Sequence, residues 1–276
     1  MLADLNKFLD LFYIPREIPQ FFAKNILDLI YTINVQGTEK VPRTGGAVLV
    51  CNHTDSLDIP VQGIYFPRKV VFLGKNEIFN PQDMFVQYIN SPQSPFRHLP
   101  LNVGKPILES LLQTLGERHK EQMRRWGGIP IMRNFQGNSA KDAVAYYEKI
   151  ENQMVEIIRS GEILSIFPEG TRTSSGVMGP FKAMAAKVAI RANVPIIPSG
   201  ISGAWNMSEP AAFLSGEAFR TKISYNIGNP IPPEQFPQAS EKKAAKLLTE
   251  ELEKRVYYLA TSPDERNQSR RFATVL

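Results

Sequence analysis

Short apolar runs alternate with longer helical segments along this chain of 276 residues, and this alternation restricts its fold more than any other feature. The runs predicted as β-strands are Ala47–Cys51, Val70–Leu73, Ile129–Met132, Ile163–Phe167, Val194–Ile197 and Lys222–Ile227. Most are largely apolar, as expected of strands buried on both faces of a parallel sheet. The last run instead alternates apolar with polar residues, which predicts a strand at the edge of the sheet.

The segments between these runs carry helical signals. The predicted helices are Pro106–Trp126, Ser139–Ser160, Pro180–Ala192 and Glu241–Ala260. Ser139 and Asp142 have the spacing of a capping box, and Gly161 follows the expected end of that helix. Strands that alternate with helices predict an α/β fold, with a largely parallel central sheet flanked by helices.

In such a sheet the ligand site lies beyond the carboxyl ends of the strands. The loops after Cys51, Met132, Phe167 and Ile197 are therefore expected to surround one crevice. A polar residue that directly follows one of these strands is a candidate for contact with a ligand.

Residues 1–36 mix Leu, Ile and Phe with charges at helical spacing, which predicts an amphipathic helical segment. One interpretation is a helical hairpin packed on the core, and the pattern alone favours it. The other is a membrane-interface anchor in which Phe21, Phe22, Leu27 and Tyr31 face lipid.

Residues 37–262 are predicted to form the principal domain, and residues 263–276 a polar tail. Within the domain, residues 80–126 are predicted to be a lid or insertion. This region begins with a segment that holds four prolines among aromatic residues, which is unusual for an ordinary connection.

The chain has a formal net charge of +5 and a pI near 9.2, which suits an anionic partner such as anionic lipid or a phosphorylated substrate. The sequence contains no recognised nucleic-acid motif, so nucleic acid is not an expected partner. A single cysteine excludes an internal disulfide and favours a reducing compartment. The three scattered histidines predict no metal site, and the sequence predicts neither a signal peptide nor a membrane-spanning helix.

His53 lies two residues after the first predicted strand and five residues before Asp58. Pro60 favours a helix that starts near Asp58, so a tight turn can bring the carboxylate back to the imidazole. A carboxylate on one ring nitrogen fixes the tautomer, and the other nitrogen can then act as a general base. Taken alone, this spacing also arises by chance.

A second cluster, IFPEGTRT, follows another predicted strand. It contains Glu169, Arg172 and Gly170, and glycine permits a turn that other residues resist. The guanidinium of Arg172 and the loop N–H groups suit a phosphate. The predicted strand Ile129–Met132 delivers Arg133 to the same side. A simpler interpretation is that Glu169 and Arg172 form an ion pair that stabilises the turn. Arg133 can likewise be a solvated surface residue.

The sequence contains neither a G-x-S-x-G nucleophile elbow nor a G-x-x-x-x-G-K-[ST] phosphate loop. A base without a protein nucleophile indicates that the substrate supplies the hydroxyl. A phosphate-bearing alcohol placed against His53 would use both clusters and Arg133.

These blocks resemble those of the glycerolipid acyltransferases, the group of lysophosphatidic acid and glycerol-3-phosphate acyltransferases. NHTDSLD resembles their N-H-x4-D block, GGIPIMR their second, FPEGTR their third and VPIIPSGISG their fourth, in the same order along the chain. The third block with an upstream N-H-x4-D is highly specific. The chain departs from the family pattern at Asp55, where serine is frequent, at Ala183, where glycine is usual, and in a longer interval between Glu77 and Gly128.

The resemblance implies that a fatty acyl group moves from acyl-CoA or acyl-carrier protein to the free hydroxyl of a lysophospholipid. It favours 1-acylglycerol-3-phosphate as the acceptor and phosphatidic acid as the product. Glycerol-3-phosphate or another membrane-lipid alcohol as acceptor, and a non-catalytic lipid-binding module on the same fold, remain open alternatives. No cofactor is implied beyond the thioester co-substrate, and the lipid substrates imply a cytoplasmic protein attached peripherally to the membrane surface.

The resemblance also implies roles for single residues. His53 and Asp58 are the expected catalytic pair. The expected substrate-binding residues are Arg133, Glu169, Gly170, Thr171 and Arg172. The arginines are expected on the acceptor's phosphate and Glu169 on its glycerol portion, and Lys182 is a weaker phosphate candidate.

Overall fold

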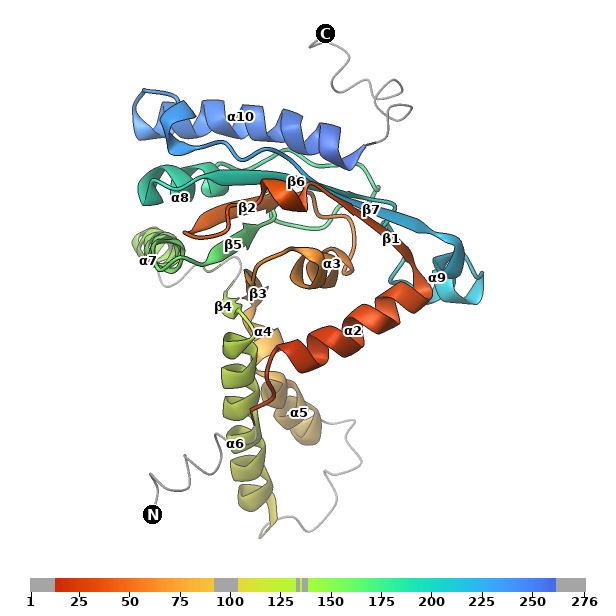
Figure 1. The fold of residues 1–276 in the computed structure, drawn as a ribbon. Coiled ribbons are helices and arrows are strands. Elements are labelled where there is room, and N and C mark those ends of the chain that lie inside the picture. Colours follow the sequence, from red (N-terminus) through yellow and green to blue (C-terminus); the bar gives the residue numbers. More distant parts are fainter. Residues whose placement is uncertain (1–12, 92–103, 133–134, 136–138, 262–276) are drawn as a thin grey trace. The chain divides into compact units, whose positions relative to one another are not determined.

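The computed structural model describes residues 13–91, 104–132, 135 and 139–261 (Figure 1). The chain divides into two compact units. The larger comprises Gln20–Val71 and Val144–Leu276, and the smaller comprises Met1–Pro19 and Phe72–Ala143.

The strands form a seven-stranded sheet in the order β1-β7-β6-β2-β5-β3-β4. Their bounds are β1 Thr32–Gln36, β2 Ala47–Cys51, β3 Val70–Lys75, β4 Gly128–Ile131, β5 Ile163–Ile166, β6 Ile196–Ser202 and β7 Lys222–Ile227. β2 pairs in parallel with both β5 and β6, β1 with β7, and β3 with β4, whereas β6 and β7 are antiparallel. This mostly parallel sheet flanked by helices confirms the predicted α/β class.

The larger unit carries the core of the protein. Its helices, which for α2 and α7 begin in the smaller unit, are α2 Glu17–Ile30, α3 Asp58–Tyr65, α7 Ala140–Arg159, α8 Met184–Ala192, α9 Pro210–Leu214 and α10 Glu241–Ala260, with 3-10 turns η1 Thr38–Lys40, η3 Ala218–Arg220 and η4 Pro233–Gln235. Every residue of β2 is fully buried, as its apolar sequence predicts. In Figure 1, α8 and α10 lie on one face of the sheet and α3 on the other.

Glycine lets α10 come close to β6. A Cβ atom on Gly200 would collide with the backbone of Leu259 and Ala260, at the carboxyl end of α10. The same end of α10 is also tied to β7, because Asn226 donates a side-chain hydrogen bond to the Leu259 carbonyl at 2.8 Å. The end of α10 is thereby held against the carboxyl end of β6, where the ligand crevice is expected.

Two predictions about strands are corrected by the sheet. β6 begins at Ile196 and continues to Ser202, so the loop expected after Ile197 starts five residues later. Pro198 lies inside this strand, and its carbonyl accepts the Gly228 N–H at 2.8 Å. β7 lies between β6 and β1 and is therefore not the edge strand that its alternating sequence predicted.

The N-terminal segment is also corrected. Residues 32–36, predicted as part of a helical segment, form β1, and residues 1–12 lie outside the described residues. Leu27 and Tyr31, which face lipid in the membrane-anchor interpretation, are buried. Tyr31 leads directly into β1, and its hydroxyl donates to the Met207 carbonyl at 2.7 Å. Phe21 and Phe22 are exposed on α2.

Helix boundaries follow local chemistry. The Ser139 hydroxyl accepts the Asp142 N–H at 3.2 Å, which confirms the predicted cap of α7. α8 begins at Met184 and not at Pro180, because the Lys182 N–H donates to the Pro168 carbonyl at 2.8 Å and holds the preceding residues in a non-helical turn.

The smaller unit contains α4 Asn76–Phe79, α5 Pro81–Asn90 and α6 Gly104–Arg125 together with β4 and most of β3. Phe79 is buried between two glycines, and a Cβ atom on Gly74 or Gly128 would lie 2.8 or 2.9 Å from its ring. The described part of the predicted lid, residues 80–126, is mainly helical, because α5 and α6 make up most of it. Its role as a lid stays a prediction, and the predicted tail 263–276 lies outside the described residues.

Within the described part of the chain, the helices are all too short or too polar to cross a bilayer.

Candidate active site

His53 and Asp58 meet at the carboxyl end of β2. The Nδ1 atom of His53 lies 2.9 Å from Oδ2 of Asp58, and both side chains are buried. Asp58 is the first residue of α3, so the turn between strand and helix brings the carboxylate back to the ring. The structure thus brings together the two residues predicted from their spacing, whereas their catalytic role stays a prediction.

The carboxylate of Asp58 is held by the turn that it closes. Its Oδ2 atom accepts the backbone N–H groups of Thr54 at 2.6 Å and Asp55 at 2.8 Å, and Oδ1 lies 3.4 Å from the Thr54 hydroxyl. A carboxylate fixed in this way orients the imidazole. When Nδ1 of His53 donates to it, Nε2 carries the lone pair that a general base needs.

The loop after β5 surrounds His53 on three sides. The Phe167 ring stacks on the imidazole, with 4.1 Å between ring centroids and 19° between ring planes. Glu169 Oε1 accepts the His53 N–H at 2.7 Å, and the Thr173 N–H donates to the His53 carbonyl at 3.0 Å. The FPEGTR block therefore holds both the ring and the backbone of His53.

Glu169 links this loop to a second one. Its Oε2 atom accepts the Gly179 N–H at 2.6 Å, so each carboxylate oxygen bonds to a backbone N–H, and the residue is only 6% exposed. Burial raises the pKa of this carboxyl, and the two backbone hydrogen bonds oppose that rise. Through these contacts Glu169 holds the backbone of His53 in place, and its predicted role in orienting the acceptor's glycerol stays a prediction.

The predicted phosphate-binding residues lie around the same loop. Arg172 is exposed, and its Nη1 atom donates to the Ser56 hydroxyl at 2.6 Å, just before α3. Gly170 has a φ of 75°, and a Cβ atom on it would lie 2.6 Å from the Lys182 ammonium. Thr171 is exposed beside them. The predicted Arg133 lies outside the described residues.

Two residues of the site were not predicted from sequence as parts of it. Asn52 forms two 2.8 Å hydrogen bonds with the backbone of Ile201, as a donor and as an acceptor, and so fastens the end of β2 to β6. Asp55, noted only as a departure from the family pattern, is buried and accepts the N–H groups of Leu57 at 2.9 Å and Ser208 at 3.4 Å. An amide or carboxylate just beyond a buried strand is the signal that could have identified them.

A comparison against protein families gives the class of this protein. The family model described as Acyltransferase matches residues 32–91 and 102–202, more than half of the chain. The chain belongs to the acyltransferase family, and the protein is an O-acyltransferase.

The chain is also similar to particular members of this class. The chain is 24% identical over 243 residues to the 1-acyl-sn-glycerol-3-phosphate acyltransferase of Bacillus subtilis, covering 88% of this chain and 95% of that protein. It is 36% identical over 104 residues to the probable 1-acyl-sn-glycerol-3-phosphate acyltransferase of Mycoplasma pneumoniae, covering 36% of this chain and 39% of that protein. The crystal structure of PlsC, the 1-acyl-sn-glycerophosphate (LPA) acyltransferase of Thermotoga maritima, has a similar fold, with a TM-score of 0.53 and 19% identity over 87% of this chain and 78% of that chain.

Proposed function

We propose that this protein transfers a fatty acyl group from an acyl thioester to the free hydroxyl of 1-acylglycerol-3-phosphate, which yields phosphatidic acid. The observation that carries the proposal is the His53–Asp58 pair, held by the FPEGTR loop in a chain that aligns with nearly the whole Bacillus subtilis enzyme. The thioester is acyl-CoA or an acyl-carrier protein.

In the proposed reaction, Nε2 of His53 removes the proton from the acceptor hydroxyl while its oxygen attacks the thioester carbonyl carbon. The new C–O bond forms, the tetrahedral intermediate collapses and the C–S bond breaks. The imidazolium, stabilised by Asp58, returns its proton to the leaving thiolate. The products are the ester and the free thiol. Because a thiolate departs readily, no covalent enzyme intermediate is needed.

The acceptor's phosphate is proposed to bind the cationic residues of the site. Arg172 belongs to the loop that holds His53, and it offers a planar set of donors at the protein surface. Lys182 lies against Gly170 of the same loop. Arg133 is retained as a proposed phosphate ligand on the basis of its place in the second block of the sequence.

We further propose that the protein acts at the cytoplasmic surface of a membrane. On α2, Phe22, Ile26 and Leu29 are exposed at helical spacing, and Phe21 is exposed beside them. An apolar stripe of this kind supports peripheral attachment through the interface, where the proposed lysophospholipid acceptor resides.

The test is a panel of acceptors with the purified protein. Radiolabelled acyl-CoA and acyl-carrier protein are supplied with 1-acylglycerol-3-phosphate, glycerol-3-phosphate or a lysophospholipid that bears a different head group. We expect labelled phosphatidic acid as the main product, and Arg172→Ala should raise KM for that acceptor by about tenfold or more. Transfer to glycerol-3-phosphate alone, or no transfer to any phosphate-bearing acceptor, would contradict the proposal.

A further inference from the structure

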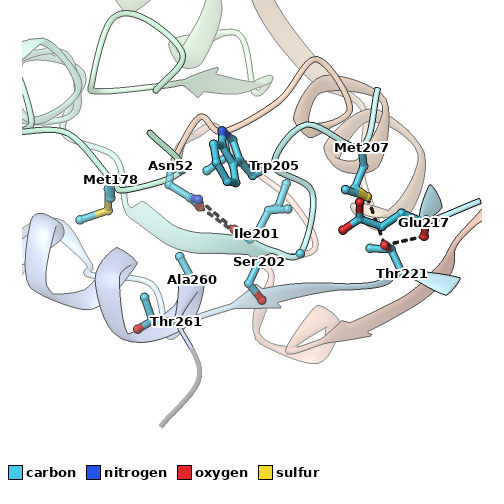
Figure 2. A pocket seen from close by; sticks show the side chains of 13 residues that line it. Asn52, Met178, Ile201, Ser202, Trp205, Met207, Glu217, Thr221, Ala260 and Thr261 are labelled. Carbon is cyan, nitrogen blue, oxygen red and sulfur yellow. Dashed lines mark hydrogen bonds between the residues drawn. The ribbon is translucent and has the colours of Figure 1, made fainter. Parts of the chain in front are cut away.

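A cavity of about 390 Å³ opens beside the His53 loop, within the larger unit (Figure 2). It is formed where the ends of β6 and α10 meet the segments around Met178, Trp205 and Glu217. The residues that line it are Asn52, Thr54, Gly176, Met178, Ile201, Ser202, Gly203, Trp205, Met207, Glu217, Thr221, Ala260 and Thr261. Neither the proposed chemistry at His53 nor the proposed phosphate ligands use this cavity.

The chemistry of the lining suits a neutral ligand with both apolar and polar parts. Met178, Ile201 and Met207 supply apolar surface, and hydroxyl groups stand among them (Figure 2). The Ser202 hydroxyl makes no hydrogen bond within the described part of the chain, so it is available to a ligand. Glu217 is the one charged residue among those that line the cavity in the described structure, so a phosphate would meet repulsion here and no cation.

The cavity wall and the His53 loop form one hydrogen-bonded unit. Asn52 and Thr54, the neighbours of His53 on both sides, line the cavity. On the other wall, Met178 precedes Gly179, whose N–H bonds to Glu169, and Glu169 in turn accepts the His53 N–H. The cavity therefore shares two of its lining residues with the loop that carries the proposed base.

The proposed reaction requires two substrates at His53, and they differ in chemistry. Arg172, the proposed phosphate ligand, contacts Ser56 beside α3, whereas the cavity is bounded by the end of α10, which lies on the other face of the sheet (Figure 1). Neither Arg172 nor Lys182 lines the cavity, so the acceptor's phosphate is proposed to bind outside it. The reactive end of the thioester donor is an uncharged chain with two amides, a hydroxyl and apolar carbon, which matches the lining.

We propose that this cavity binds the pantetheine arm of the acyl donor, the part that acyl-CoA and acyl-carrier protein share. This inference rests on the proposed acyl transfer. The arm enters past Trp205, its amides and hydroxyl meet Ser202 and neighbouring polar groups, and its sulfur reaches the side of the loop that carries His53. The nucleotide of CoA, or the carrier protein, stays outside the cavity.

The test fills the cavity and measures each substrate separately. Ser202→Phe places a ring in the space that the arm would occupy. KM for acyl-CoA and acyl-carrier protein should rise by about tenfold or more, while KM for the acceptor stays unchanged. Ser160→Phe makes the same change at an exposed position in the turn just after α7, outside the cavity lining, and should alter neither constant.

Truncated donors identify the part of the thioester that is bound. In the wild type, an acyl-pantetheine should have a higher kcat/KM than an acyl-N-acetylcysteamine thioester, which lacks most of the arm, and Ser202→Phe should abolish this difference. Trp205→Ala, at a partly exposed site on the cavity wall, provides a second variant and should weaken the same preference. If the wild type uses only one of the two natural donors, a rise in its KM identifies that donor as the source of the arm and supports the proposal.

Three results would overturn the inference. The first is an unchanged donor KM in both folded variants, and the second is a rise confined to the acceptor KM. The third is a loss of kcat/KM that depends on acyl-chain length and is equal for the two truncated donors. Failure of the proposed function is distinguishable, because then the wild type itself transfers no acyl group to a lysophospholipid.

Discussion

At the scale of single residues, His53 is held by more contacts than its motif implies. Asp58 bonds to Nδ1, Phe167 stacks on the ring, and the backbone is held at its N–H by Glu169 and at its carbonyl by Thr173. A base held by these contacts keeps one orientation, so little rearrangement is needed at the moment of proton transfer. Substitutions at His53 and Glu169 should therefore have different signatures.

Replacing His53 by alanine removes the proposed base, whereas Asp58 still accepts the N–H groups of Thr54 and Asp55 that close the turn. The transfer rate should fall by about 10²–10⁴-fold, the usual contribution of a positioned general base. Initial rates with labelled acyl-CoA measure the loss, and circular dichroism should show an unchanged fold. His119→Ala is the matched control, because His119 contacts the Ile78 carbonyl in the smaller unit and should keep full activity. Wild-type turnover by the His53→Ala variant would remove His53 from the mechanism.

Replacing Glu169 by glutamine should lower kcat and leave the acceptor KM almost unchanged. One oxygen of the amide can still accept the His53 N–H, but its NH₂ group would face the N–H of Gly179, which is also a donor. The free energy of unfolding should fall by about 1–3 kcal/mol, measured by denaturant titration. Glu162→Gln, at a partly exposed ion pair with Lys69, is the control. A raised acceptor KM with unchanged kcat would instead place Glu169 on the substrate.

At the scale of elements, α2 has two faces with different functions. Leu27 faces the core, whereas Phe22, Ile26 and Leu29 face solvent, and Leu29 is 83% exposed. This helix is continuous with β1, whose pairing with β7 attaches it to the sheet. The apolar stripe is therefore presented on a rigid support, which suits the proposed contact with a membrane interface.

A charge on this stripe should weaken membrane binding without disturbing the site. Phe22→Glu combined with Leu29→Glu should lower the affinity for lipid vesicles by about tenfold or more, because each buried apolar side chain contributes about 1.5–3 kcal/mol. Vesicle co-sedimentation measures this loss, and turnover of a soluble short-chain acceptor should stay unchanged. Leu247→Glu adds one such charge at an exposed leucine of α10 and should bind vesicles normally. Equal binding by both variants would exclude α2 as the contact.

At the scale of the whole molecule, the sheet gathers distant segments at one edge. The ends of β2, β5 and β6 are adjacent because β2 pairs in parallel with both neighbours. The His53 loop, the FPEGTR loop and the cavity wall therefore meet, although about 150 residues of chain separate Asn52 from its partner Ile201.

The net charge of +5 should make vesicle binding selective for anionic lipid. Binding should be tighter to vesicles that contain phosphatidic acid or phosphatidylglycerol than to neutral vesicles, and it should weaken as salt is raised, since exposed charges are screened over about 8–10 Å at physiological ionic strength. Co-sedimentation across a salt series measures both effects. Affinity that is independent of lipid charge and of salt would show that apolar contact alone drives attachment.

The amino-acid sequence determined the features that depend on neighbours along the chain. The apolar runs identified β2 and β5, Ser139 marked the start of α7, and the five-residue spacing of His53 and Asp58 sufficed for one turn to close their hydrogen bond. Only the tertiary structure decided that β1 is a strand, that Glu169 supports His53, and that a cavity lies beside the base. Each of these depends on contacts between residues far apart in sequence, whose register and distance are set by the packing of the sheet and leave no local pattern.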